Sequence, residues 1–169
     1  MVNEKLIKRA EGGDVKAQFE LATSYFESGE AFEGAKWLEK SAMGGYAVAQ
    51  YFQGNMRKDV YGDVKGATEW YKKAASQNYA PAQGMMALTF VASNNFSQAR
   101  NWAERAYKNG DRDNSPLVFA QLYLQGNGGY AQDVIKAYQY TKESAENGNE
   151  TAAQLKAQME NAIPQLKWM

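Results

Sequence analysis

The sequence predicts an all-α protein, a solenoid of helix-turn-helix repeats. The main observation is a sequence motif, Ala-x-x-Gly-x-x-x-Ala or a close variant, that recurs where helices are expected to break. It begins at Ala10, Ala42, Ala75, Tyr107 and Ala145. The intervals are 32, 33, 32 and 38 residues, and periods in the thirties are typical of helix-turn-helix solenoids. The Gly or Asn of each motif suits the left-handed conformation of a helix C-cap. The alanines would let neighbouring helices approach closely.

Composition narrows the possible functions. The chain has 169 residues with neither cysteine nor histidine, about the length of a single domain and enough to bury a core. Without cysteine there is no disulfide, thiolate nucleophile or thiolate metal site. Without histidine, zinc chemistry and Ser-His-Asp catalysis are excluded. Acid–base chemistry by carboxylates, Lys or Tyr stays open in principle.

The charge balance bears on partners and location. Lys plus Arg number 19, Asp plus Glu also number 19, and the net charge is zero, so no electrostatic feature favours nucleic acid or an anionic membrane surface. No apolar run is long enough to cross a bilayer. The first residues, Met1-Val2-Asn3-Glu4-Lys5, lack the apolar core of a secretory signal. We therefore expect a cytoplasmic protein, with a mature exported form whose signal has been removed left open.

The first half of the chain is expected to hold a partial helix over 3–12 and two repeats. Asp14 is a candidate N-cap for a helix over 15–27, and after a turn at 28–30 its partner helix covers 32–43. The second repeat should have a helix over 47–58. A turn at 60–62 follows, and Asp63 should cap the next helix, which carries Trp70, Tyr71, Ala74 and Ala75.

The second half is expected to hold two more repeats and a lid. Pro81 suits the first turn of a helix whose residues 83–92 are apolar nearly all round, which indicates burial or a cover. Its partner follows a turn at 93–95 and runs to about Lys108. Ser115-Pro116 reads as an N-cap and first-position proline of a helix ending near Gln125, and a glycine-rich loop over 126–133 accounts for the longest interval. Thr151 and Gln154 form a capping-box pattern for a polar last helix that ends before Pro164.

These elements predict one repeat domain over 1–169. Its repeats are expected at about 14–45, 46–78, 79–110 and 111–148, and its capping helix at 151–163.

The fourth repeat carries the most specific motif. It reads Leu122-Tyr123-Leu124-Gln125-Gly126-Asn127-Gly128-Gly129, then Asp133, Lys136-Ala137, Tyr140, Ser144-Ala145 and Gly148. This string resembles the Sel-one-like repeat, a branch of the tetratricopeptide-like solenoids. The second repeat matches its later half with Asp63, Lys65, Ala67, Trp70-Tyr71 and Lys73-Ala74-Ala75. The first and third repeats depart from the pattern because their inter-helix loops are short.

The resemblance implies a right-handed α-α superhelix whose concave face binds other proteins. Members act as adaptors, and some small bacterial ones are immunity proteins that block a secreted toxin. The cysteine pair frequent in the family is absent, which weakens a disulfide-stapled, secreted interpretation.

Two motifs that suggest ligand chemistry have simpler explanations. Gly126 to Ala131 fits G-x-G-x-x-A, but a dinucleotide site needs a strand before this motif, and here a helix is expected. Asp111-Arg112-Asp113-Asn114 suggests a calcium loop, but the sixth and twelfth positions hold Pro116 and Leu122 in place of Gly and Glu. Both are interpreted as connecting loops. We therefore predict no catalytic, cofactor-binding or metal-binding residues.

The candidate partner-binding residues come from the first helix of each repeat, which lines the concave face in the resembled family. Repeat by repeat, that register places there Lys16, Phe19, Thr23 and Glu27; Val48, Tyr51, Asn55 and Lys58; Gly84, Leu88 and Val91; and Leu117, Gln121 and Leu124. Aromatic, amide and aliphatic groups with few charges suit a peptide or protein better than a phosphate. The tryptophans and tyrosines of the second helices are expected in the core.

The function predicted is non-catalytic binding of a protein or peptide partner in the concave groove, with no cofactor, nucleic acid or membrane involved. An immunity protein that neutralises a cognate toxin is an alternative, and an enzyme is a disfavoured alternative of another class. The oligomeric state stays open. A sharper hypothesis makes Leu88 and Val91 a binding hot spot, against the alternative that they only pack inside the solenoid.

Overall fold

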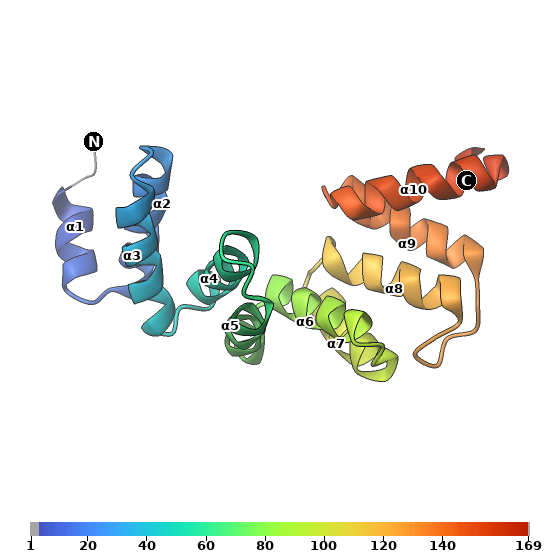
Figure 1. Ribbon diagram of the computed structural model, residues 1–169, viewed down its shortest axis with the longest axis horizontal. Helices are drawn as coiled ribbons and strands as arrows, with labels where there is room; N and C mark the ends of the chain where they lie inside the picture. Colours follow the sequence, from blue (N-terminus) through green and yellow to red (C-terminus); the bar gives the residue numbers. More distant parts are fainter. Residues whose placement is uncertain (1–3, 169) are drawn as a thin grey trace. The chain divides into compact units, whose positions relative to one another are not determined.

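The computed structural model describes residues 4–168, which form ten α-helices, one short 3-10 helix and no strand. The all-α prediction is confirmed (Figure 1). Asn3, where the predicted first helix begins, lies outside the described residues. The helices are α1 Glu4–Glu11, α2 Val15–Glu27, α3 Ala31–Met43, α4 Ala47–Asp59, α5 Val64–Ser76, α6 Ala80–Ala92, α7 Phe96–Lys108, α8 Asn114–Gln125, α9 Val134–Glu146, α10 Glu150–Ala162 and the 3-10 helix η1 Pro164–Trp168.

The chain forms two compact units. Unit 1 ends at Gln77 and holds α1 to α5, in which α2 packs on α3, α3 on α4 and α4 on α5. Unit 2 begins at Asn78 and holds α6 to η1, in which α6 packs on α7 and α8, α8 on α9, and α9 on α10. Consecutive helices therefore pack on one another within each unit, as a repeat solenoid requires. The repeat boundaries given above stay predictions.

The Gly or Asn of the recurring motif has a left-handed backbone conformation at each of its occurrences. Gly13, Gly45, Gly110 and Gly148 have φ values of 90°, 95°, 99° and 93°, and Asn78 has 62°. A side chain with a Cβ is costly there, so the choice of Gly or Asn follows from the backbone. Most of the alanines that flank these breaks are fully buried. The predicted C-caps are confirmed.

Several predicted helix starts are confirmed. The Asp14 carboxylate accepts hydrogen bonds from the backbone N–H groups of Lys16 (3.0 Å) and Ala17 (3.1 Å). Asp63 accepts one from Gly66 N–H at 2.8 Å. Each bond satisfies a donor that the first turn of a helix leaves without an intrahelical partner. Pro81 lies in the first turn of α6, as expected.

Two predicted starts are wrong. α8 begins at Asn114, not after Ser115, because the buried carboxylate of Asp111 accepts from the N–H groups of Asn114 (3.4 Å) and Ser115 (2.6 Å). Pro116 is therefore the third helical residue rather than the first. α10 begins at Glu150, and its cap is the Asn149 side chain, which accepts from Ala152 N–H at 2.9 Å. Thr151 lies inside the helix.

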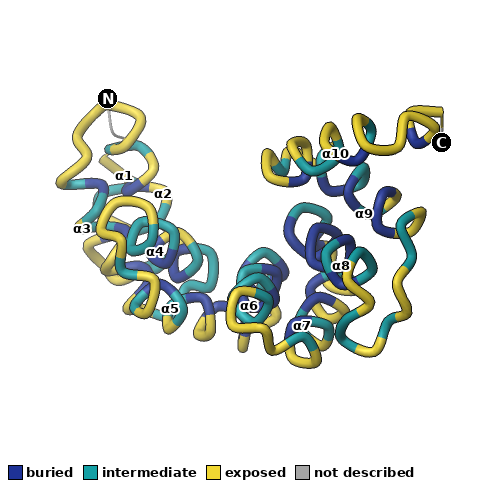
Figure 2. The backbone as a smooth tube through the Cα atoms, turned by 45° about the vertical axis from the view of Figure 1, so that its right-hand side comes forward, coloured by how far each residue is buried: buried dark blue, intermediate teal, exposed yellow. Residues whose placement is uncertain are grey.

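The cores of the two units differ in content. In unit 1, Ala22, Leu38, Ala42 and Ala49 form a small cluster over which partly buried rings pack. In unit 2, a larger cluster includes Val118, Phe119 and Leu122 of α8, which is buried over most of its length (Figure 2). Leu88, Phe90 and Val91 of α6 pack against this cluster, so the all-round apolar character of α6 reflects packing on two neighbours.

The aromatic residues of the second helices pack as predicted. Trp37 and Trp70 cover the unit 1 cluster, and Trp102 covers the unit 2 cluster. The glycine-rich segment lies between α8 and α9, and Tyr130 from this loop stacks on Tyr123 of α8 at 4.5 Å between ring centroids. The segment is therefore an inter-helix loop that docks on the core.

Candidate protein-binding surface

The predicted residues of α2 are one aromatic and three polar side chains. Phe19 is half-buried, and its ring centroid lies 5.6 Å from that of Tyr46 and 5.5 Å from that of Phe52. Lys16, Thr23 and Glu27 are exposed on the same helix. The Thr23 hydroxyl donates to the Phe19 carbonyl oxygen at 3.1 Å. Exposed polar groups thus share a helix with a half-buried aromatic side chain, a combination found in many protein interfaces.

The predicted residues of α4 continue the aromatic surface. Tyr51 lies 5.5 Å from Phe52 and 5.9 Å from Tyr71, between ring centroids. The Tyr71 hydroxyl donates to Asn55 Oδ1 at 2.8 Å. Burial raises the pKa of Tyr71, so this hydroxyl keeps its proton near neutral pH. Val48 and Lys58 are half-buried, and the Lys58 ammonium lies 3.3 Å from the Asp59 carboxylate.

The structure brings Phe19 and Tyr51 together through Phe52, which the sequence reasoning missed. Its side chain is 44 % exposed, and its ring lies near both others. We call Phe19, Phe52 and Tyr51 the aromatic row. The family register, followed strictly, passes over Phe52; the adjacent pair of aromatic residues on α4 is the signal that could have indicated it.

The predicted residues of unit 2 lie mainly in packed positions. Leu88 and Val91 are half-buried against the α8 cluster, Leu117 is 3 % exposed, and Gly84 is buried. Leu124 packs against the cluster of Ala137, Tyr138, Met159 and Leu166. Gln121 is different, because its side-chain oxygen is buried without a hydrogen-bond partner among residues 4–168.

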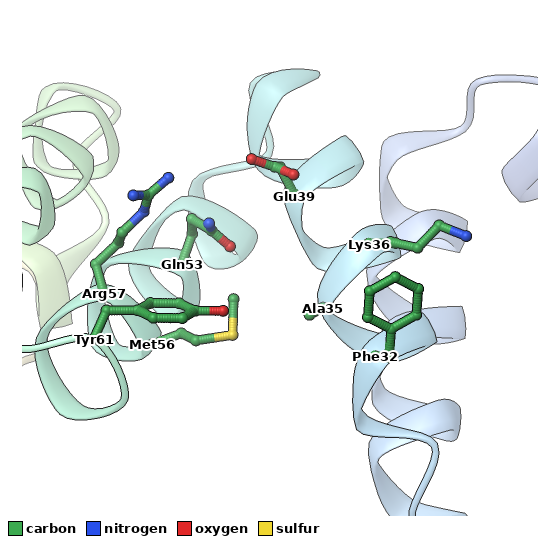
Figure 3. Close-up of a pocket in the computed structure, with 8 residues that line it drawn as sticks. All are labelled: Phe32, Ala35, Lys36, Glu39, Gln53, Met56, Arg57 and Tyr61. Carbon is green, nitrogen blue, oxygen red and sulfur yellow. The ribbon is translucent and has the colours of Figure 1, made fainter.

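A cleft of about 280 Å³ lies between α3 and α4, and none of its residues was among the predicted ones (Figure 3). Phe32 and Tyr61 are large side chains that are 76 % and 63 % exposed there. The lining is Phe32, Ala35, Lys36 and Glu39 from α3, with Gln53, Met56, Arg57 and Tyr61 from α4 and the turn after it. The sequence signal that could have indicated the cleft is an aromatic residue at the start of α3 and another in the α4–α5 turn.

Charges within the cleft are partly compensated. The Lys36 ammonium lies 3.0 Å from the Glu33 carboxylate, and Arg57 Nη1 lies 3.7 Å from that of Asp63.

In the described part of the chain, no three acidic side chains gather as a metal ion would require. Within the same part, no helix is both long enough and apolar enough to cross a bilayer.

Comparison with known families decides the relationship. The family model of the Sel1 repeat matches residues 15–46, 46–79, 89–111 and 120–149, which together make up more than half of the chain. The chain belongs to the Sel1 repeat family. Sel1 repeat proteins are generally protein-interaction modules, and their fold is typically a non-catalytic scaffold. No curated protein matches this Sel1 repeat chain.

Solved structures show the same fold. The protective antigen c5321 of uropathogenic Escherichia coli strains, which displays an SLR fold, has a TM-score of 0.72 and 29 % identity, over 90 % of this chain and 35 % of that one. A Sel1 repeat protein from Oxalobacter formigenes has a TM-score of 0.67 and 25 % identity, over 86 % and 63 %. MamA, at 17 % identity and a TM-score of 0.54 over 91 % of this chain and 86 % of that chain, shares the fold alone. This chain spans less than two thirds of the length of the first two.

Proposed function

We propose that this Sel1 repeat chain is a non-catalytic protein-binding module that engages a protein or peptide partner through the first helices of its repeats. The observation that supports the proposal is the aromatic row, which joins α2 to α4 and whose middle member, Phe52, is 44 % exposed. Aromatic side chains are enriched among interface hot spots because they bury a large area at low entropic cost.

The surroundings of the aromatic row fit a protein partner. Lys16 and Glu27 place opposite charges on the same helix as Phe19, and Thr23 adds a hydroxyl. A mixed polar rim around an apolar centre is typical of protein interfaces, whereas a phosphate ligand would require clustered positive charge. The row therefore favours a polypeptide ligand.

Affinity capture from the source cells, with quantitative mass spectrometry, tests the proposal. Wild-type protein should enrich a partner that the Phe52→Ala variant loses, because truncating an exposed ring removes contact area without opening the core. Val64→Ala on α5 is the matched control, since Val64 is 62 % exposed and outside the row. Equal capture of the same partner by wild type and Phe52→Ala would contradict the proposal.

The hot-spot hypothesis for α6 is tested by Leu88→Ala and Val91→Ala. Both side chains pack against the α8 cluster, so each change should lower the melting temperature. The hypothesis requires that they also weaken binding of the captured partner. A lower melting temperature with unchanged affinity would leave both residues as packing residues only.

A further inference from the structure

Gln53 and Arg57, which line the α3–α4 cleft, lie on the opposite face of α4 from Tyr51 of the aromatic row. At 3.6 residues per turn, Gln53 and Arg57 point roughly away from Tyr51, Asn55 and Lys58. Phe32 and Tyr61 then complete the cleft. None of Phe19, Phe52 and Tyr51 lines the cleft, so the cleft is a separate surface from the one proposed above.

The cleft holds an unsatisfied acceptor and an unsatisfied donor. Gln53 Oε1 and Arg57 Nε are both buried and have no hydrogen-bond partner among residues 4–168. Gln53 itself is 3 % exposed. The two residues are four apart in α4 and are therefore neighbours on one face of this helix. Their polar ends lie on the same side of α4 (Figure 3). Buried polar groups are nearly always paired in folded proteins, so a neighbouring orphaned acceptor and donor call for an explanation.

The two atoms together specify the chemistry of a ligand. Gln53 Oε1 needs an N–H donor, and the Arg57 Nε–H needs an acceptor. A carboxylate or phosphate offers acceptors only and would leave Gln53 facing another oxygen. An ammonium group offers donors only and would leave Arg57 unpaired. The backbone of one extended residue offers an N–H and a C=O that point to the same side, which matches both.

The rest of the cleft suits a peptide side chain. Phe32 and Tyr61 expose most of their surface, and Met56 adds a flexible apolar group. Both orphaned atoms are buried although their residues line the cleft, so a lining side chain has to turn aside for a ligand to reach them. Tyr61, which lies outside the helices and is 63 % exposed, has few packing contacts to lose.

We propose that the α3–α4 cleft is a second binding site that takes an extended peptide segment. One residue of the segment, in extended conformation, donates its backbone N–H to Gln53 Oε1 and accepts at its C=O from Arg57 Nε–H, and a large apolar side chain packs against Phe32 and Tyr61. The site does not depend on the aromatic row, so either surface can bind a partner without the other.

The test uses a capped tripeptide, N-acetyl-Val-Phe-Val N-methylamide, titrated into the 15N-labelled full chain. The Arg57 Nε–H and Gln53 side-chain amide signals should shift saturably, with a Kd on the order of 1 mM as expected for a short capped peptide. An ester analogue in which oxygen replaces the Phe N–H should bind about tenfold more weakly, because Gln53 Oε1 then has no donor.

Protein variants separate the hydrogen bonds from charge and fold. Gln53→Met keeps the side-chain volume and should lower peptide affinity about tenfold, with a melting temperature equal to or above wild type because a buried unpaired acceptor is removed. Arg57→Lys keeps the positive charge beside Asp63 but removes the Nε–H, and it should weaken binding to a similar degree. Wild-type affinity in Arg57→Lys would overturn the proposal.

A variant of the aromatic row, which does not line the cleft, distinguishes this proposal from the previous one. Phe52→Ala should bind the tripeptide like wild type, whatever it does to capture of the cellular partner. Loss of tripeptide binding in Phe52→Ala, with Gln53→Met unaffected, would move the peptide to the aromatic row and overturn the cleft. No saturable shift at about 10 mM peptide would also overturn it.

Discussion

Unit 1 and unit 2 are built from the same kind of helix pairs but place their large apolar side chains differently. Ten large hydrophobic residues are exposed in the described chain, and seven of them belong to unit 1: Phe26, Phe32, Met43, Phe52, Val60, Tyr61 and Val64. The other three large hydrophobic residues, Ile135, Ile163 and Trp168, belong to the described part of unit 2. The repeat thus sets the backbone in both units, while the side chains direct apolar surface outward in the first and inward in the second.

The aromatic residues show the same contrast. In unit 2, Phe119, Tyr123, Tyr130 and Tyr140 form one connected group, with neighbouring ring centroids 4.5 to 6.5 Å apart, over a cluster that includes Leu122. In unit 1, the aromatic row reaches the surface at its middle member, Phe52. Both candidate binding surfaces lie in unit 1, where apolar area is still available to a partner. We infer that stability is concentrated in unit 2 and recognition in unit 1.

The largest effect is expected from the unit 2 core. Leu122 is 1 % exposed within the α8 cluster, so Leu122→Ala should lower the free energy of unfolding by about 2–5 kcal/mol. Phe32→Ala in unit 1 removes a larger side chain that is 76 % exposed, and it should change stability by only about 0.5 kcal/mol or less. Urea denaturation followed by circular dichroism measures both. Equal losses would contradict the contrast between the units.

The next effect concerns two glycines that allow close helix approach, one in each unit. A Cβ on Gly54 would lie 2.5 Å from the Tyr71 ring, and a Cβ on Gly84 would lie 2.5 Å from the Asp111 carboxylate. Gly54→Ala and Gly84→Ala should each cost about 1–3 kcal/mol through overpacking, measured by denaturation. Adding Tyr71→Leu to Gly54→Ala should cost less than the sum of the two single changes. Additive losses would show that the ring is not the obstacle.

The fold was largely predictable because its determinants are local. Each determinant acts within a few residues of its own helix. These determinants are the Gly or Asn of the recurring motif, the Asp14 and Asp63 caps, and Pro81. The start of α8 was not predictable in this way. It depends on the Asp111 carboxylate, whose burial beside Gly84 of α6 is a tertiary contact.

The candidate surfaces were predictable only in part. Phe19 and Tyr51 follow from the family register, and the structure links them through Phe52. The cleft depends on which faces of α3 and α4 stay uncovered after packing, and on Gln53 Oε1 and Arg57 Nε losing access to water without gaining a partner. Neither property is encoded in a short motif.

The third prediction compares the two carboxylate caps, whose pKa values shift in opposite directions. Hydrogen bonds from the Ala17 N–H and then from Arg9 lower the pKa of Asp14. Its stabilising contribution is therefore present above the ordinary Asp pKa and is lost as pH falls through the lowered value. Burial raises the pKa of Asp111 despite the N–H groups it accepts from. The unfolded state ionises first, so this group's contribution falls as pH rises from the ordinary Asp range.

Asn variants at the two caps should consequently respond to pH with opposite signs. The stability loss caused by Asp14→Asn should be greater at about pH 6 than at about pH 3, and the loss caused by Asp111→Asn should be smaller at about pH 6 than at about pH 3. Urea denaturation at both pH values provides the measurement. A loss that grows with pH for both variants would show that the hydrogen bonds accepted by Asp111 outweigh the cost of burying its charge.

The smallest effect is expected on the second helices, where the two units are alike. A cation covers the tryptophan ring one turn earlier in each of three repeats: Lys40 over Trp37 at 4.0 Å, Lys73 over Trp70 at 4.0 Å and Arg105 over Trp102 at 4.8 Å. At such surface positions a cation–π contact contributes about 0.5–1 kcal/mol. Lys73→Met in unit 1 and Arg105→Met in unit 2 should therefore lower stability by similar small amounts.

Lys72→Met is the matched control, because Lys72 is exposed on the same helix one residue before Lys73, and its replacement should leave stability unchanged. A melting curve for each variant is sufficient to rank the three. If Lys73→Met lowered stability several times more than Arg105→Met, the second helices would also differ between the units. The contrast between unit 1 and unit 2 could then not be assigned to the placement of the large apolar side chains alone. Similar costs would assign it there, because the shared scaffold would then contribute equally to both units.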